Sequence, residues 1–180
     1  MPQSDRFIVI TGGPGSGKTT LIRALADRGL AHMPEAGRAI IRHQVAIGGR
    51  ALPWDDRPAF AELMLAWEMR SYEAAQSVPG PVIFDRGVPD VAGYLSLCGL
   101  AVPEHVLRAA EFYHYRRQVF IAPPWPEIFV QDAERKQGLE EARATYDALA
   151  ATYAALGYEL RALPLAPVAE RVDIVMAAIA

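Results

Sequence analysis

The residues with the clearest chemical potential form a glycine-rich turn near the start of the chain. Its sequence, GGPGSGKT over residues 12–19, matches the pattern G-x-x-x-x-G-K-[ST] at every fixed position. Glycines at this spacing let backbone N–H groups turn towards phosphate oxygens, and the N-terminus of a following helix adds partial positive charge. Lys18 can then reach the β and γ phosphates of a nucleotide, and the Thr19 hydroxyl can ligate Mg²⁺. The predicted nucleotide-binding residues are Gly12, Gly13, Pro14, Gly15, Ser16, Gly17, Lys18, Thr19 and Thr20.

The alternative for this turn is a glycine-rich connection that binds no ligand. A β-branched apolar run at residues 7–10 comes directly before it, and apolar residues at helical spacing follow from Lys18. Because the motif requires a strand before it and a helix after it, this context favours phosphate binding. We therefore expect ATP and Mg²⁺ as cofactors.

Three charged residues further along the chain are candidate catalytic groups. Asp85 ends an apolar strand, where a carboxylate can hold Mg²⁺ through water; the alternative is a helix cap or a turn. Glu35 follows the second predicted strand, where it can accept the proton of an attacking hydroxyl, although a helix N-terminus also favours glutamate. Arg86 can hold a substrate phosphate or hydroxyl, or pair with a nearby carboxylate.

Two further regions are predicted to contact substrates. The polar segment within residues 124–138 is expected to act as a lid, with Arg135 near the transferring phosphoryl group; the alternative is a solvated charged surface that also includes Asp132, Glu134 and Lys136. The helical region 36–77 is expected to form the acceptor pocket. Its polar and aromatic candidates are Arg38, His43, Gln44, Trp54 and Arg57, of which Arg38 could instead pair with Glu35.

Strands and helices alternate along the chain. The predicted strands are residues 7–10, 30–33, 81–85, 119–122 and 158–163. Between the second and third strands, Asp55 or Asp56 is expected to cap a helix whose buried side carries Phe60, Leu63, Met64 and Trp67. The alternation predicts an α/β fold of the P-loop NTPase class, with a five-stranded parallel sheet and helices on both faces. No repeat or linker divides the sequence, so residues 1–180 are expected to form a single domain.

The composition excludes several classes of partner. Of 180 residues, 52% are hydrophobic and 22% are charged, which is typical of a globular protein in water. The formal charge of −3 provides no overall basic field, so we expect no nucleic-acid partner. Cys98 is the only cysteine, which rules out an internal disulfide and fits a reducing cytoplasm. No apolar stretch is long enough to span a membrane, and we expect a cytoplasmic location.

Three segments carry a resemblance to a known family: residues 34–38, residues 84–87 with Asp90 and Tyr94, and residues 123–125 followed by Asp132 and Arg135. Together with the glycine-rich turn, they resemble small P-loop ATPases of the AAA type allied to the nicotinamide-riboside kinase domain. The sequence is more loosely similar to nucleoside and nucleotide kinases. Over nearly the whole chain, this resemblance implies a kinase-like fold. It also implies that Glu35 is the base and that Asp85 and Arg86 form the acidic–arginine pair after the third strand.

Two functions follow from these patterns. The first is a magnesium-dependent kinase that transfers the γ-phosphoryl group of ATP to a nucleoside, nucleotide or similar hydroxyl acceptor. Lys18, Mg²⁺ and Arg135 would stabilise the transferring group while Glu35 activates the acceptor. The alternative is an ATPase or a nucleotide-dependent binding switch with no small-molecule acceptor. A signalling GTPase is disfavoured because the sequence lacks an Asn-Lys-x-Asp element.

Overall fold

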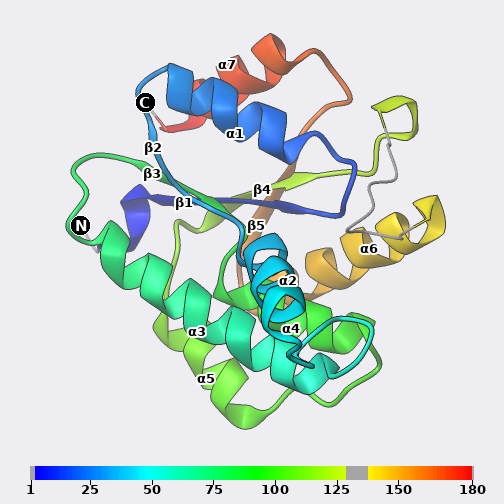
Figure 1. The fold of residues 1–180 in the computed structure, drawn as a ribbon. Coiled ribbons are helices and arrows are strands. Elements are labelled where there is room, and N and C mark those ends of the chain that lie inside the picture. Colours follow the sequence, from blue (N-terminus) through cyan, green and yellow to red (C-terminus); the bar gives the residue numbers. More distant parts are fainter. Residues whose placement is uncertain (1–2, 129–137, 180) are drawn as a thin grey trace.

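The computed structural model describes residues 3–128 and 138–179, and its strands form one sheet (Figure 1). The strand order is β2-β3-β1-β4-β5, and each neighbouring pair is parallel. The five-stranded parallel sheet and the position of each predicted strand are confirmed. The strands are β1 (Phe7–Gly12), β2 (Ala31–Met33), β3 (Val82–Asp85), β4 (Gln118–Ala122) and β5 (Glu159–Ala162).

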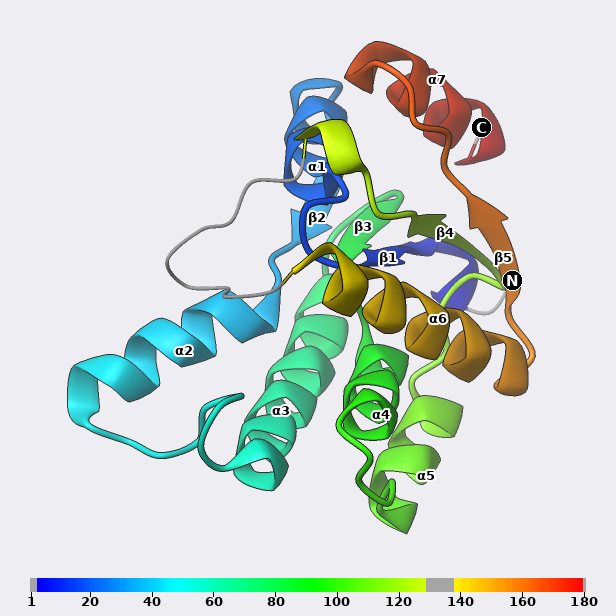
Figure 2. The ribbon, with the colours of Figure 1, turned by 90° about the vertical axis from the view of Figure 1, so that its right-hand side faces the viewer.

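Helices cover both faces of the sheet, as predicted. Helices α1 and α7 pack together on one face, while α3, α4, α5 and α6 lie on the other (Figure 1). Helix α2 lies beside α3, and both connect β2 to β3 (Figure 2). No helix within the described residues is long and apolar enough to cross a membrane. The helices are η1 (Gln3–Arg6), α1 (Lys18–Asp27), α2 (Ala36–Ile47), α3 (Arg57–Ala75), α4 (Val88–Leu97), α5 (Glu104–Phe112), η2 (Pro126–Ile128), α6 (Leu139–Ala155) and α7 (Val168–Ile179).

The central strand β1 explains why its sequence is apolar without alternation. Side chains of a strand point alternately to the two faces of a sheet, and helices cover both faces here. Phe7 and Val9 belong to the core under α3 and α4, whereas Ile8 and Ile10 belong to the core under α1 and α7. All four side chains are fully buried. A smaller apolar cluster between α2 and α3 includes Phe60 and Ile40.

Helix α3 buries a broader side than the predicted stripe, of which Phe60, Met64 and Trp67 are buried or half-buried against the cluster between α2 and α3. Its N-terminal cap is as expected, because the Asp56 side chain accepts a hydrogen bond from the Ala59 N–H at 3.0 Å. Phe60 is buried, but Leu63 is 37% exposed, which corrects the predicted stripe. The buried side also includes Leu65 and Glu68. Hydrophobic periodicity missed this part of it because one of its buried members is a carboxylic acid.

The sheet brings the predicted functional residues together at the carboxyl ends of its strands. The carboxyl ends of parallel strands all lie on the same side of the sheet, and β2, β3 and β1 are neighbours in it. Glu35 follows β2, Asp85 and Arg86 lie at the end of β3, and the glycine-rich turn follows β1. Residues that are up to 74 positions apart in the chain (Gly12 and Arg86) therefore meet above the carboxyl ends of three adjacent strands.

Candidate active site

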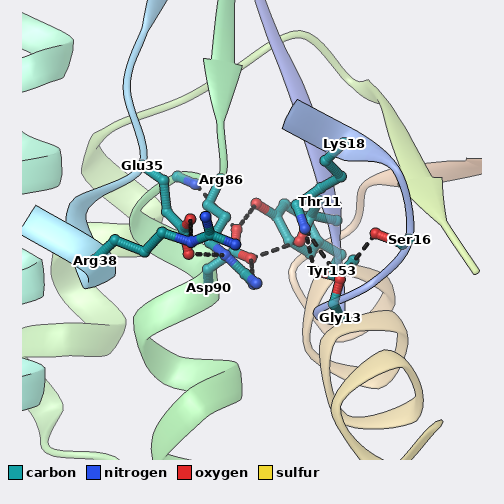
Figure 3. Close-up of polar contacts among 11 residues, drawn as sticks. Thr11, Gly13, Ser16, Lys18, Glu35, Arg38, Arg86, Asp90 and Tyr153 are labelled. Atoms are coloured by element: carbon teal, nitrogen blue, oxygen red, sulfur yellow. Dashed lines mark hydrogen bonds and ion pairs between the residues drawn. The ribbon is translucent and has the colours of Figure 1, made fainter. Parts of the chain in front are cut away.

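The predicted phosphate loop connects β1 to α1 and can be built only with glycine at key positions. Gly12 has φ +134°, and a Cβ there would lie 2.3 Å from the carbonyl oxygen of Ala122 on β4. Gly17 caps α1 in the left-handed conformation, with φ 76°. The buried Lys18 side chain turns back across the loop, and its Nζ donates hydrogen bonds to the carbonyls of Gly12 at 2.9 Å and Gly13 at 3.1 Å (Figure 3).

A buried arginine from the C-terminal helix contacts the same loop. Arg171 of α7 is 3% exposed, and its Nη1 donates a hydrogen bond to the Ser16 carbonyl at 3.0 Å. Its guanidinium carbon lies 5.8 Å from the centre of the Trp125 ring. Burial lowers the pKa of Arg171. Because the C=O and N–H of a trans peptide point in opposite directions, this bond orients the N–H of Gly17 away from α7.

Glu35 and two arginines form an ion-pair cluster next to the loop. Glu35 is the residue before α2, and its side chain is 13% exposed. Its Oε1 lies 3.4 Å from Nε of Arg86, and its Oε2 lies 3.7 Å from Nε of Arg38 (Figure 3). The structure therefore matches the alternative in which Arg38 is a partner of Glu35. The carboxylate is held between two guanidinium groups at the edge of the sheet.

Arg86 adopts an unusual backbone conformation directly after β3. Its φ is 75°, and it is the one non-glycine residue with positive φ in the described part of the chain. Its guanidinium bridges Glu35 and Asp90, with Nη1 3.2 Å from Oδ1 of Asp90. Burial alone would lower the pKa of Arg86, but the carboxylates of Glu35, Asp90 and Asp85 outweigh it and raise that pKa above its ordinary value. In this structure Arg86 therefore pairs with nearby carboxylates, which is one of the two roles expected for it from the sequence.

Asp90 joins four parts of the structure through one carboxylate. Its Oδ1 accepts hydrogen bonds from the Thr11 hydroxyl of β1 and from Arg86, and its Oδ2 accepts from the Gly87 N–H at 3.0 Å (Figure 3). The Tyr153 hydroxyl of α6 also donates to Oδ2, at 2.6 Å. Burial, together with this carboxylate, raises the pKa of Tyr153 well above its ordinary value. Asp90 thereby ties the segment after β3 to β1 and α6.

A cavity of about 290 Å³ opens beside the loop and the ion-pair cluster. Pro14 of the loop, Glu35 and Arg86 contribute to its lining. The apolar part of the lining includes Phe60 and Tyr94, whose ring centres lie 5.5 Å apart. A cavity of this kind, largely apolar with a few convergent polar groups, is typical of a small-molecule site.

The two predicted magnesium ligands lie at the ends of neighbouring elements. Thr19 is exposed in the first turn of α1, and Asp85 is the buried last residue of β3. Hydroxyl and carboxylate oxygens are the ligand types that Mg²⁺ prefers, so the donor set fits that ion. Within the described residues no group of three or more His, Cys, Asp and Glu side chains is arranged to hold a metal by itself.

A family model described as an AAA domain matches residues 7–171 of the sequence. The chain belongs to this AAA-domain family. No curated protein sequence matches the chain.

Solved structures of P-loop kinases resemble this AAA-domain protein in fold. Deoxyadenosine kinase from M. mycoides with bound dATP has a TM-score of 0.67 and 13% identity, over 96% of this chain and 98% of that one. NadR in complex with NR has a TM-score of 0.68 and 17% identity, over 98% of this chain and 51% of NadR. Shikimate kinase from Acinetobacter baumannii in complex with shikimate has a TM-score of 0.58 and 15% identity, over 97% of this chain and 92% of that one. The kinase-like P-loop fold predicted from the sequence is confirmed.

The predicted acceptor residues of this AAA-domain protein separate into two groups. Trp54 and Arg57 line the cavity. His43 is exposed on α2 and does not line it, and its ring lies 6.3 Å from that of Trp67. Gln44 also lies outside the lining and accepts a hydrogen bond from the Ala51 N–H at 3.2 Å. The lid candidates Asp132, Glu134, Arg135 and Lys136 lie outside the described residues.

Sequence reasoning assigned no role to several residues that organise this site. Asp90 belongs to a segment that resembles the family, and an acidic residue in the first turn of a helix is a recognisable capping signal. Tyr153 could be placed on the buried side of α6, but no local pattern indicates its bond to Asp90. Glu68 and Arg171 are charged residues on largely apolar faces, and only that contrast could have drawn attention to them.

Proposed function

We propose that this AAA-domain protein is a magnesium-dependent kinase that transfers the γ-phosphoryl group of ATP to the hydroxyl of a small molecule. The observation that carries the proposal is that the predicted phosphate loop and the Glu35 carboxylate border one cavity of about 290 Å³. A donor site and a candidate base that face a common, largely apolar space are what transfer to a bound alcohol requires. A nucleotide switch with no small-molecule acceptor would not need this cavity beside the phosphate loop.

The donor side is assigned to the glycine-rich loop. Backbone N–H groups of residues 12–20, apart from Pro14, which has none, would surround the phosphates together with the N-terminus of α1. Lys18 would contact the γ-phosphate after leaving the carbonyls of its own loop. Thr19 and Asp85 would hold Mg²⁺, which when bound neutralises charge on the β and γ phosphates. Deoxyadenosine kinase with bound dATP and NadR in complex with NAD and AMP-PNP share this fold, which supports a nucleotide as the ligand here.

The acceptor side is assigned to Glu35 and the cavity. Glu35 would accept the proton of the acceptor hydroxyl, and Arg86 and Arg38 would keep its carboxylate oriented. Trp54, Arg57 and Phe60 would enclose the rest of the acceptor. Arg135 remains a candidate for stabilising the transferring group.

The proposal is tested by incubating the purified protein with ATP, Mg²⁺ and a panel of hydroxyl compounds. The panel contains adenosine, deoxyadenosine, other nucleosides, nucleotides, nicotinamide riboside and shikimate, and mass spectrometry detects any compound that gains one phosphate. We expect a phosphorylated product that requires both ATP and Mg²⁺. Release of free phosphate at the same rate with and without every compound would instead identify an ATPase.

Replacing Glu35 by glutamine is expected to lower kcat about 10²- to 10⁴-fold, because an amide cannot accept the proton. The KM for ATP should change little, since Glu35 lies on the acceptor side of the cavity. Steady-state kinetics with the acceptor from the panel measures both constants. Glu73→Gln makes the same exchange at an exposed position of α3 and should leave both constants unchanged. An active Glu35→Gln enzyme would remove Glu35 as the base.

Replacing Arg171 by methionine is expected to weaken ATP binding about 10-fold or more, because a charged hydrogen bond to the loop is lost. Arg171→Lys should recover part of the affinity. Calorimetry with Mg·ATP measures the dissociation constants, and melting curves report folding separately. Arg28→Met is the matched control, since Arg28 of the same α1–α7 region has only an exposed ion pair with Asp173 at 3.8 Å. Unchanged affinity in Arg171→Met would show that the contact does not orient the loop.

A further inference from the structure

Glu68 is a buried carboxylic acid in the wall of the cavity. It lies on α3, is 4% exposed and contributes to the lining. The carboxylates of Glu35 and Asp90 in the same lining contact Arg86, whereas no donor among the described residues makes a hydrogen bond to Glu68. A buried polar group without a partner costs free energy and calls for an explanation, such as a ligand, an ion or a water that supplies the partner.

The groups that face Glu68 disfavour its charged form. Burial raises the pKa of Glu68 well above its ordinary value, and the carboxylates of Asp90, Asp85 and Glu35 raise it further, against the opposing effect of Arg86. The Tyr115 hydroxyl is also close and is itself a weak acid whose pKa is raised by burial. An un-ionised carboxyl group offers one O–H donor and one carbonyl acceptor side by side.

The walls around Glu68 are suited to the apolar faces of a flat ring. Phe60 and Tyr94 meet edge to face, with an angle of 70° between their planes, and Met64 and Leu97 continue the apolar surface. Aromatic and flexible thioether side chains pack well against a planar ring.

The charges of the cavity disfavour an anionic acceptor. Among the lining residues that the structure describes, the carboxylates of Glu35, Asp90 and Glu141 outnumber the guanidinium groups of Arg57 and Arg86, so an anionic group would be repelled. An un-ionised Glu68 offers a donor and an acceptor rather than a charge, so an uncharged ring meets its requirements.

On the basis of the proposed kinase function, we propose that Glu68 is a specificity residue that makes paired hydrogen bonds to the ring of an uncharged acceptor. The acceptor is an alcohol whose flat ring carries neighbouring donor and acceptor atoms, and its hydroxyl lies towards Glu35. Neutral nucleosides have this chemistry. Glu68 thus selects the acceptor, whereas Glu35 acts on its hydroxyl.

Two substitutions of Glu68 test whether its side chain acts as a neutral carboxyl group or as a carboxylate. Glutamine has the shape of an un-ionised glutamic acid and keeps one donor and one acceptor, whereas methionine keeps the length of the side chain and loses both. Binding of adenosine and deoxyadenosine (neutral), nicotinamide riboside (cationic) and shikimate (anionic) is measured by calorimetry in the presence of AMP-PNP and Mg²⁺. We expect a neutral nucleoside to bind, with affinity within about 3-fold of wild type in Glu68→Gln and at least about 10-fold weaker in Glu68→Met. Glu73→Gln on the same helix should bind like wild type.

Three results would overturn the inference: equal loss in Glu68→Gln and Glu68→Met, wild-type affinity in Glu68→Met, or failure of both neutral nucleosides to bind. Infrared difference spectra of wild type minus Glu68→Gln at neutral pH provide a ligand-free measurement. The carbonyl band of an un-ionised acid is expected, and carboxylate bands in its place would contradict the proposal. Because binding needs no turnover, a nucleoside that binds through Glu68 without gaining phosphate would refute the kinase and leave this inference intact. If the protein phosphorylates an acceptor whose binding is unchanged in Glu68→Met, the kinase proposal stands and the inference on Glu68 is refuted.

Discussion

Replacing Lys18 by alanine is expected to weaken ATP binding about 10- to 100-fold and to slow phosphoryl transfer about 10³-fold. The ammonium group is the one side-chain cation inside the predicted phosphate loop, and charge on the γ-phosphoryl group is greatest as it is transferred. Lys18 is 7% exposed and donates to two carbonyls of its own loop, so it is already held where the phosphates would lie. Calorimetry with Mg·ATP and a single-turnover assay measure the two effects separately.

The control for this experiment is Arg23→Ala on the same helix, where the side chain is exposed. It should leave binding and rate unchanged. Melting curves show whether Lys18→Ala is folded, because the substitution also removes the two hydrogen bonds within the loop. A folded Lys18→Ala protein that binds and turns over ATP like wild type would refute the assignment of the phosphate loop.

Replacing Asp90 by alanine is expected to lower the free energy of unfolding by about 3–5 kcal/mol, the range for breaking a buried ion pair from one side. The substitution leaves the Thr11 hydroxyl, the Gly87 N–H and the Tyr153 hydroxyl without their acceptor. It also leaves Arg86 with Glu35 as its remaining carboxylate contact within hydrogen-bond range. Urea unfolding followed by circular dichroism measures the loss.

Two further variants show whether this loss comes from the buried network. Tyr153→Phe removes one of the four donors and should cost about 1–2 kcal/mol. Glu159→Ala breaks an exposed ion pair with Arg117 at 3.1 Å and should cost about 0–1 kcal/mol. If Asp90→Ala is no less stable than Glu159→Ala, Asp90 does not hold the segment after β3 in place.

The role of Asp90 also has a consequence for activity. Arg86 is kept at φ 75° by its contacts, and strain of this kind persists only where the surroundings hold it. In Asp90→Asn the shape of the side chain is kept but its charge is lost, so Arg86 should relax and Glu35 should lose part of its orientation. A fall in kcat larger than the change in the KM for ATP would be expected from that displacement.

Local sequence patterns determined the helices and strands and the conformation of the glycine-rich turn. An unbroken apolar run predicts a strand covered on both faces, and Phe7–Ile10 lies at the centre of such a sheet. Asp56 was one of two adjacent candidates for the cap, because the bond that a cap makes reaches only three residues along the chain. The glycine-rich turn was identifiable because the conformations it needs belong to its own residues, as at Gly12 and Gly17. These features depend on neighbours in sequence.

Only the tertiary structure decided which charged residues belong together. The bonds from Asp90 to Thr11 and to Tyr153 join residues 79 and 63 positions apart, and no local pattern encodes such a pairing. The same holds for Arg171, which reaches the loop from 155 residues away. Glu68 was hidden for a related reason: hydrophobic periodicity predicts a face for apolar side chains, and a buried acid beside a cavity violates that rule. The sequence thus determined the fold and the glycine-rich turn, while the network beside the proposed acceptor cavity arises where distant segments pack together.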